Sequence, residues 1–505
     1  MRSLTSCEIA QGGRQDGKAV VHCTYDDGSN EELGCEHFAV LEIPAQGIQV
    51  SNAVIDELRL SGIIEGEVLI QNCFIAAVAK GHCVEFEERV DFSGSAFLGS
   101  CDFSATFHGR VRFDKATFFD TCEFSGTFNR WTSFEGASFW GDVASFQEAD
   151  LGGISFKMAN ARGYDFNFQE AYVSQGDFLF SDVRIEQGLV DFSGTVFDDV
   201  KLVSFLGLET DSTVKFNRAS LDCNELRWYH ANVEKLVFLS CDLNCAKAEF
   251  QMECHSLIIN GGTNQKSLDF RPTTGLSAFS LCGLANMGII LIDRSPDELI
   301  KLIDVPVATV WEKGRQWRNP THKDKADQYF TLKQVFNRNG FYENEDAMYC
   351  AYRRELRKQR LETAKNHLTD RNAGIIARLK EAMYFPRHFL YDFLVCDVVG
   401  CYATSPKRVF ATCLITILVF SFLMTPITVS LDTLIHAEDF AQAIAPVLHT
   451  WSDGLYNSAQ AFLTVGFLGS ESAGAALRTI CAIEGFLGVF LITYFTASFA
   501  HRVLR

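Results

Sequence analysis

The fold of this chain is decided by residues 92–139, which read FSGSAFLGSCDFSATFHGRVRFDKATFFDTCEFSGTFNRWTSFEGASF. Phenylalanine recurs in this stretch with a period of 21 residues. The aligned positions are Phe92, Phe113 and Phe134, then Phe97, Phe118 and Phe139, then Cys101 and Cys122. Self-similarity at a fixed interval of this size is typical of repeat architectures, in which similar units stack on one another.

Within each repeat a large apolar residue comes about every five positions, as in Phe113-Asp-Lys-Ala-Thr-Phe118. Neither the 3.6-residue helical period nor the two-residue strand period explains this spacing. A coil with four sides of about five residues does, if each side sends one large side chain and a small neighbour such as Ala116 or Ala137 inward. Successive coils would pair their backbones at roughly 4.8 Å. The sequence therefore predicts a solenoid in which each turn is buried only against its neighbours.

These repeats resemble the pentapeptide-repeat family, whose units centre on Phe or Leu with Ala two positions before. The resemblance is good over 86–222 and degenerate in 40–85 and 222–292. It implies a right-handed quadrilateral β-helix. We expect an N-terminal cap or irregular β segment in 1–40 and the solenoid in 41–294. Of the 63 aromatic residues, 44 are Phe, and we interpret this Phe ladder as structural.

The net charge of the 505-residue chain is −18 and is unevenly distributed. Residues 1–300 contain 44 acidic and 22 basic residues, residues 301–408 contain 13 and 20, and residues 409–505 contain 6 and 3. An acidic body argues against general nucleic-acid binding, which needs a basic face. Seventeen cysteines without a secretory signal predict reduced thiols that face the cytosol.

Residues 295–404 are expected to form an amphipathic helical linker and an interfacial helix. Apolar residues at 329, 332, 335 and 336 predict a first helix, which Asn339-Gly340 ends. A second helix is expected over 343–364, with a basic cluster around one face: Arg353, Arg354, Arg357, Lys358 and Arg360. We expect the cluster to contact anionic headgroups or a neighbouring subunit; the alternative is a solvated face with local Glu–Arg pairs.

Residues 385–399 (FPRHFLYDFLVCDVV) are aromatic and apolar but short, which favours a helix lying in the membrane interface. The linker as a whole resembles the helical segment that follows the repeats in bacterial fusions of pentapeptide repeats with a pore module.

Two apolar runs in the tail are long enough to cross a bilayer. Residues 409–429 carry no charge, and residues 479–500 carry one acid, Glu484. Lys407 and Arg408 precede the first run, basic residues follow the second, and the loop between them is mainly acidic. The positive-inside rule then places both termini in the cytoplasm, with the bacterial inner membrane as the expected location.

Between these runs, an apolar half-helix over 455–463 leads directly into Thr464-Val465-Gly466-Phe467. Non-helical backbone at membrane depth needs a protein-lined cavity. Carbonyl oxygens of such an extended segment, contributed by several chains, can replace an ion's hydration shell. The sequence therefore predicts a pore helix at 455–463 and a selectivity filter at 464–469. The filter residues are Thr464, Val465, Gly466, Phe467, Leu468 and Gly469.

Residues 405–505 together resemble the two-span pore-loop module of the potassium-channel superfamily. The resemblance implies a homotetramer and a permeant monovalent cation, K⁺ or Na⁺. It also places Glu484 behind the filter, bonded to the pore helix, and makes Gly485 or Gly488 a hinge. Either Leu468 replaces the second Gly of the superfamily or it is an insertion before Gly469, and no Asp follows. Leu does not readily adopt the left-handed conformations that Gly permits, so K⁺-selective, nonselective and absent conduction remain alternatives.

The remaining candidate sites carry little chemistry. Cys241, Cys245, Cys254 and His255 have the composition of a zinc site, but they lie in repeat-like sequence where small thiols fill a coil. We therefore expect a structural role and no metal. The chain contains no phosphate-binding Gly loop, nucleophile elbow or metalloprotease helix, so we expect neither an enzyme nor a cofactor.

The expected fold is mixed: a quadrilateral β-helix, a helical linker and a C-terminal two-helix transmembrane pore domain. The order of these parts predicts an oligomeric cation channel gated by a large cytoplasmic sensor or docking domain. Its expected partners are further copies of itself, the lipid bilayer and an unidentified cytoplasmic ligand or protein on the solenoid, with no nucleic acid. The alternatives are a non-conducting, membrane-tethered acidic scaffold and a DNA-mimicking binding protein.

Overall fold

The computed structural model describes residues 4–10, 18–81, 83–303, 307–308, 317–318, 320–369, 382–383, 385–424, 440–463 and 475–504. The chain divides into two compact units, Met1–Glu345 and Asp346–Arg505. The first unit is a β-solenoid of about eleven turns followed by helices, and the second unit is helical.

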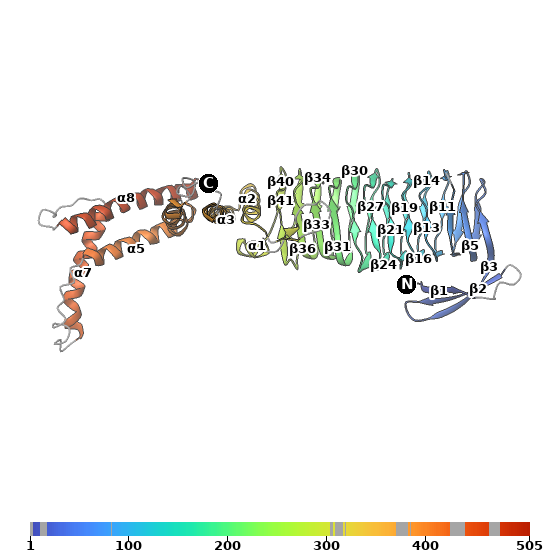
Figure 1. The fold of residues 1–505 in the computed structure, drawn as a ribbon, viewed down its shortest axis with the longest axis horizontal. Helices are drawn as coiled ribbons and strands as arrows, with labels where there is room; N and C mark the ends of the chain where they lie inside the picture. The colour runs from blue at the N-terminus through green and yellow to red at the C-terminus, as the bar shows by residue number, and fades with distance from the viewer. Residues whose placement is uncertain are drawn as a thin grey trace. The chain divides into compact units, whose positions relative to one another are not determined.

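Each regular coil of the solenoid consists of four short strands separated by turns. In one coil these are β10 (Glu85–Phe86), β11 (Val90–Asp91), β12 (Ala96–Phe97) and β13 (Cys101–Asp102). The next strand, β14 (Thr106–Phe107), pairs in parallel with β10 and begins the next coil. Cys101 likewise aligns with Cys122, so the predicted 21-residue period is confirmed here. Figure 1 shows the resulting stack of coils.

Later coils are longer than the sequence period predicts. Phe128 aligns with Leu151 and Phe178 with Val203, which are intervals of 23 and 25 residues. Nine-residue strands then appear in place of two short ones. These strands are β30 (Val196–Ser204), β31 (Glu209–Asn217), β33 (Ala231–Leu239) and β36 (Met252–Asn260). The degenerate repeats therefore still form coils, because the parallel pairing continues although the Phe spacing does not.

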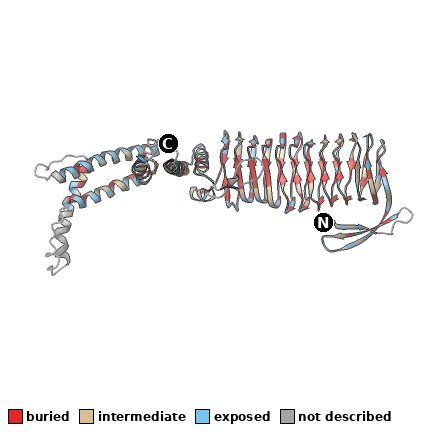
Figure 2. Ribbon diagram, viewed as in Figure 1, coloured by how far each residue is buried: buried red, intermediate tan, exposed pale blue. Residues whose placement is uncertain are grey.

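The Phe residues fill the interior as stacked ladders. Along one ladder the ring centroids of Phe92, Phe113, Phe134 and Phe156 are separated by 5.4, 5.0 and 5.0 Å, with planes within 11° of parallel. All four side chains are fully buried, and Figure 2 shows the buried residues running along the stack. Offset ring pairs at such distances add about 0.5–1.5 kcal/mol each beyond the area that they bury. The stacked Phe side chains therefore form the hydrophobic core of the solenoid.

Residues near the N-terminus form an antiparallel arm that continues into the first coil. The arm comprises β1 (Leu4–Ile9), β2 (Lys18–Tyr25) and β3 (Asn30–Glu42). The second half of β3 pairs in parallel with β5 (Ala53–Leu60). Apolar residues of the arm and of the first coils share a hydrophobic cluster that includes Val21 and Phe74. Part of the 1–40 segment, for which a cap or an irregular β segment was expected, is therefore continuous with the solenoid sheet.

Two helices lie at the other end of the solenoid, α1 (Pro296–Ile303) and α2 (His322–Arg338). Thr321 and Asp324 form a reciprocal capping box that starts α2. At its end, the Arg338 guanidinium donates to the carbonyl oxygens of Asn286 and Gly288 at 3.0 and 2.8 Å, and the Asn339 amide donates to that of Ile290 at 2.7 Å. Backbone acceptors at the edge of the last coil are thus satisfied by side chains.

Gly340 adopts a positive φ of +75° just after α2. Helix α3 (Tyr342–Thr369) begins two residues later. Within its described residues, the second unit contains most of α3 and four further named helices. These are the π-helix η1 (His388–Val399), α5 (Pro406–Met424), α7 (Phe440–Phe462) and α8 (Ala475–Val503). The expected interfacial helix at 385–399 thus contains a long π-helical segment, which its sequence pattern does not reveal. Helices α5, α7 and α8 contact one another pairwise.

Candidate functional site

Helices α5 and α8 are each long and apolar enough to cross a membrane. Helix α5 ends at Met424, so the last residues of the predicted span at 409–429 lie outside the described residues. Helix α8 contains the whole predicted span at 479–500 and extends beyond both of its ends. Many large side chains on both helices are exposed within the second unit, including Phe422 and Phe486. Such surfaces suit lipid or further copies of the chain.

The segment between the two apolar helices is a longer helix than the sequence predicts. Helix α7 begins at Phe440 rather than Leu455 and ends at Phe462. The run Ser452-Asp453-Gly454 favours a helix start, because Ser and Asp are preferred N-cap residues and Gly weakens helices. Helical hydrogen bonding nevertheless continues through it. The expected pore helix is therefore the C-terminal part of α7.

Ser458 and Glu484 join α7 to α8 in the interior of the group formed by α5, α7 and α8. Both side chains are fully buried. The Ser458 hydroxyl is hydrogen-bonded to Glu484 Oε1 and also lies 2.8 Å from the carbonyl oxygen of Ile417 on α5. Glu484 Oε2 has no hydrogen-bond partner among the described residues. One polar cluster thus connects all three helices, and one of its carboxyl oxygens is unsatisfied there.

Gly485 and Gly488 lie where the end of α7 approaches the backbone of α8. A Cβ atom at Gly488 would be 2.1 Å from the carbonyl oxygen of Phe462, and one at Gly485 would be 3.3 Å from that of Ala461. A side chain at position 488 would therefore force the two helices apart, whereas position 485 is only tight. The structure places both glycines, which the sequence suggested as hinges, at helix-packing positions.

All six predicted filter residues, Thr464 to Gly469, lie outside the described residues. The structure describes the chain up to Leu463 and again from Ala475. The described residue just before the filter, Leu463, continues the helical hydrogen bonding of α7 through its backbone N–H to the carbonyl oxygen of Ala459 at 3.0 Å.

The basic cluster of α3 separates into residues with different neighbours. Arg354 and Arg357 both pair with Asp397 of η1, at 2.8 Å each. Lys358 pairs with Glu355 one turn earlier at 2.7 Å. Arg353 lies over the ring of Tyr402, with 5.3 Å between its guanidinium carbon and the ring centroid, and Arg360 is exposed. Sequence reasoning missed Asp397, whose importance comes from a fold that brings it to two arginines some 40 positions earlier.

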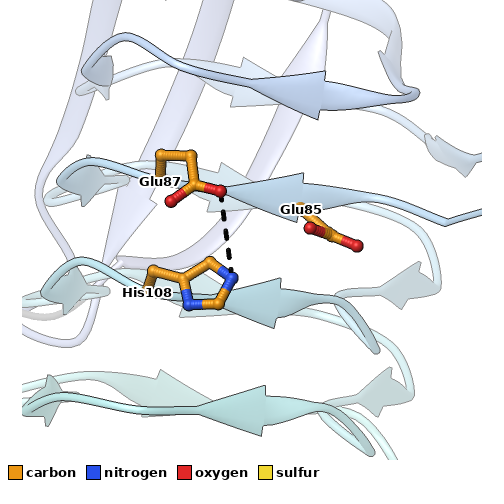
Figure 3. Close-up of side chains that lie close together, drawn as sticks. All are labelled: Glu85, Glu87 and His108. Atoms are coloured by element: carbon orange, nitrogen blue, oxygen red, sulfur yellow. Dashed lines mark ion pairs between the residues drawn. The ribbon is translucent and has the colours of Figure 1, made fainter.

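The four residues considered for zinc are not brought together. The Cys245 thiol lies 3.0 Å from that of Cys223 in the coil interior. The Cys241 and Cys254 thiols contact backbone carbonyl oxygens, and the His255 ring contacts Ser277. Among the described residues, Glu85, Glu87 and His108 form a close His–carboxylate group on the outside of the solenoid (Figure 3). Glu87 and His108 already pair at 4.0 Å, and Asn129 contacts the other ring nitrogen at 3.0 Å.

A cleft of about 620 Å³ lies between the N-terminal arm and the solenoid. Tyr25 and Leu33 line it from the arm, and Asn72, Gly94 and Lys115 line it from successive coils. Its volume is within the usual range for sites that hold small molecules.

No family model, curated protein or solved structure matches this chain. A function for this chain is therefore inferred from the contacts of its own residues.

Proposed function

We propose that the chain is the subunit of a homotetrameric channel for a monovalent cation, K⁺ or Na⁺. In this proposal α5 and α8 cross the bacterial inner membrane, with both termini in the cytoplasm. The solenoid is a right-handed quadrilateral pentapeptide-repeat β-helix, as the four strands of each regular coil favour, and it serves as a sensor or docking domain that controls gating.

The observation that carries the proposal is the position of the end of α7. Ser458 bonds to groups on both apolar helices, and the backbone at Phe462 reaches the glycine surface of α8. A buried carboxyl group in an apolar helix is costly and by default functional. The chain then enters Thr464-Val465-Gly466-Phe467 within two residues of this contact. A helix held in this way directly before a filter-like sequence is what a pore requires.

A membrane-tethered scaffold would need only the two apolar helices. It would have no use for a third helix that is joined to both of them by buried hydrogen bonds. A DNA-mimicking protein would use the acidic solenoid and would not need α5, α7 and α8 at all. The channel is therefore the function that the second unit supports best.

Gating by the solenoid is supported by contacts at both ends of the linker. Helix α2 bonds to the last coil through Arg338 and Asn339. Farther along, α3 pairs with η1, the element before α5, through Arg354 and Arg357. A change in the state of the solenoid would reach α5 through this series of paired elements.

Cation flux into liposomes with the purified full-length protein tests the proposal. We expect K⁺ or Na⁺ to cross with the wild-type protein and flux to be lost in Gly466→Asp. Gly34→Asp is the matched control, because Gly34 has open space around it and should leave flux unchanged. The native mass of the detergent-purified protein should correspond to four copies. Absence of flux with a folded wild-type protein, together with a monomeric mass, would leave the scaffold as the better explanation.

A further inference from the structure

The segment that joins η1 to α5 has an unusual backbone. Cys401, Tyr402 and Ala403 are consecutive non-glycine residues in the left-handed region, with φ of 47°, 57° and 67°. Such residues are strained and persist only where the surroundings hold them. Here the Ala403 N–H donates to the Tyr494 hydroxyl of α8 at 3.0 Å. We name residues 400–404 the elbow; it connects the linker to both apolar helices.

Cys350 of α3 is buried against this elbow. Its thiol lies 3.1 Å from the carbonyl oxygen of Cys401 and 3.2 Å from the Thr404 hydroxyl. Cys350 is 4% exposed and Cys401 is 8% exposed. Two cysteines far apart in the sequence thus lie in contact where the linker helix meets the segment before the first apolar helix.

The charges around the two thiols differ, and they favour one particular protonation pattern. Hydrogen bonding with Cys350 lowers the pKa of Cys401 below its ordinary value; burial opposes this shift, and Arg354 and Arg408 add to it. The same hydrogen bond, together with burial, raises the pKa of Cys350. Arg354 Nη2 lies 3.8 Å from the Cys401 sulfur, and Asp397 accepts from the same guanidinium. The proton therefore stays on Cys350 and the thiolate forms on Cys401.

We propose that Cys350 and Cys401 form a redox-sensitive pair, which a hydroperoxide oxidises to a disulfide that ties α3 to the elbow. A thiolate next to a cation and beside a second thiol is the arrangement of a reactive cysteine with its resolving partner. Disulfides in reducing compartments are usually transient and regulatory. A transient disulfide between α3 and the elbow would regulate the connection between them. This inference does not depend on conduction by the second unit.

The chemical steps balance with hydrogen peroxide as the oxidant. The Cys401 thiolate attacks one peroxide oxygen, an S–O bond forms as the O–O bond breaks, and the departing hydroxide takes a proton to become water. The Cys350 sulfur then attacks the Cys401 sulfur, and an S–S bond forms as the S–O bond breaks. The hydroxide that leaves takes the Cys350 proton as a second water. Two thiols are oxidised by two electrons in total, and one peroxide is reduced to two waters.

The solenoid contains two internal controls. The Cys101 and Cys122 sulfurs are 3.1 Å apart and the Cys223 and Cys245 sulfurs 3.0 Å apart, all in the buried interior. Burial raises the pKa of Cys101, and the hydrogen bond to Cys223 raises that of Cys245. We expect these two pairs to stay reduced.

The test treats the full-length protein in phospholipid vesicles with hydrogen peroxide and maps disulfides by mass spectrometry of unreduced peptides. We expect a Cys350–Cys401 cross-link that dithiothreitol reverses, while both solenoid pairs stay as thiols. In Cys350→Ser, Cys401 should accumulate as a sulfenic acid that dimedone traps. In Cys401→Ser, Cys350 should remain a thiol. Oxidation of the solenoid pairs without a Cys350–Cys401 cross-link would overturn the proposal.

The rate of cross-linking against pH gives a second readout. We expect a midpoint below that of an ordinary thiol in the wild-type protein, and an upward shift of about one pH unit in Arg354→Gln because a nearby cation is removed. Arg360→Gln is the matched control, since Arg360 is exposed on the same helix, and should leave the midpoint unchanged. A wild-type midpoint above about pH 8, that of an ordinary thiol, would also overturn the assignment.

Discussion

The Ser458 hydroxyl of α7 is hydrogen-bonded to the Glu484 carboxyl group of α8, and both side chains are fully buried. The same hydroxyl lies 2.8 Å from the carbonyl oxygen of Ile417. A hydroxyl has one hydrogen, and the carbonyl oxygen can only accept it. Both hydrogen bonds of Ser458 can form together if Glu484 is protonated and donates to Ser458. A neutral carboxyl group is also the form that an apolar interior favours.

A first prediction follows from this hydrogen-bond pattern. Glu484→Gln should keep the protein folded, because the amide can donate to Ser458 as a protonated carboxyl does. Glu484→Ala should lower the stability of the second unit by about 1–3 kcal/mol, the usual cost of leaving a buried polar partner unsatisfied. Thermal unfolding of the purified protein, followed by the fluorescence of Trp451 on α7, measures both. Equal destabilisation by the two variants would contradict a donating Glu484.

A second prediction concerns the glycine surface of α8. Gly488→Ala should destabilise the packing of α7 on α8 by about 1–3 kcal/mol, the usual cost of overpacking, because its Cβ would meet the Phe462 backbone. Gly485→Ala should cost clearly less, since its nearest neighbour is 3.3 Å away. The thermal midpoint and the oligomeric fraction of the two variants provide the comparison. If both variants behave alike, the close approach at Gly488 is not a constraint on packing.

The third prediction tests the filter alignment on which the proposed function depends. Leu468→Gly should increase the preference for K⁺ over Na⁺, because Gly can adopt the left-handed conformations that direct carbonyl oxygens towards an ion. Leu468→Ala removes most of the side chain but not this restriction, and it should leave selectivity close to that of the wild-type protein. Relative permeability from reversal potentials in planar bilayers measures the effect. Unchanged selectivity in Leu468→Gly would count against the alignment.

A fourth prediction addresses the Phe ladder. Phe134→Ala should destabilise the solenoid by about 3–5 kcal/mol, as large-to-small changes in cores do, because Phe134 is fully buried between Phe113 and Phe156. Phe134→Leu should cost less. Phe341→Ala, at a position that is 52% exposed, should change stability by less than about 0.5 kcal/mol. Urea unfolding, monitored through the far-ultraviolet circular dichroism signal of β-structure, distinguishes the three variants.

A fifth prediction concerns acid stability. Burial alone would raise the pKa of Asp91, but hydrogen bonds from Ser93, Arg89 and Gln71 hold it below its ordinary value. A carboxyl group whose pKa is lower in the folded state stabilises the folded protein. This contribution is fully present above the unfolded-state pKa of about 3.9 and is lost as pH falls through the folded-state pKa.

The stability of the solenoid should therefore be nearly constant above about pH 5 and fall below about pH 4. Asp91→Asn should reduce the slope in the acid range, and Glu123→Gln, at an exposed position, should not. Urea midpoints measured between pH 3 and pH 7 provide the test. Identical acid slopes in the wild-type protein and Asp91→Asn would show that Asp91 contributes nothing to the pH dependence.

The solenoid was readily predicted from sequence because its coils repeat a local rule. A Phe every five residues in a 21-residue period specifies which side chains point inward, and parallel pairing of neighbouring coils follows from it. The same rule fails where the spacing drifts, so the nine-residue strands from β30 onwards and the 25-residue interval from Phe178 to Val203 were not anticipated. There the backbone pairing continues because neighbouring coils support it.

In the linker, the sequence predicts the helices but not the contacts between them. The basic residues of α3 were visible in the sequence, and so was their helical spacing. Their partner Asp397 was not, because an ion pair between residues some 40 positions apart depends on the path of the chain between them. The elbow at Cys401–Ala403 gives no local sequence signal, since none of its three left-handed residues is a glycine.

The sequence by itself determined the β-solenoid, its Phe core and the two helices able to cross a membrane. Each of these depends on the local order of side chains or on the length of an apolar run. Only the tertiary structure decided that Ser458 bonds to Glu484, that Gly488 admits the end of α7 and that Cys350 lies against Cys401. Those relationships join residues that are 26 or more positions apart, and their energies come from burial and close packing, which exist only once the helices meet.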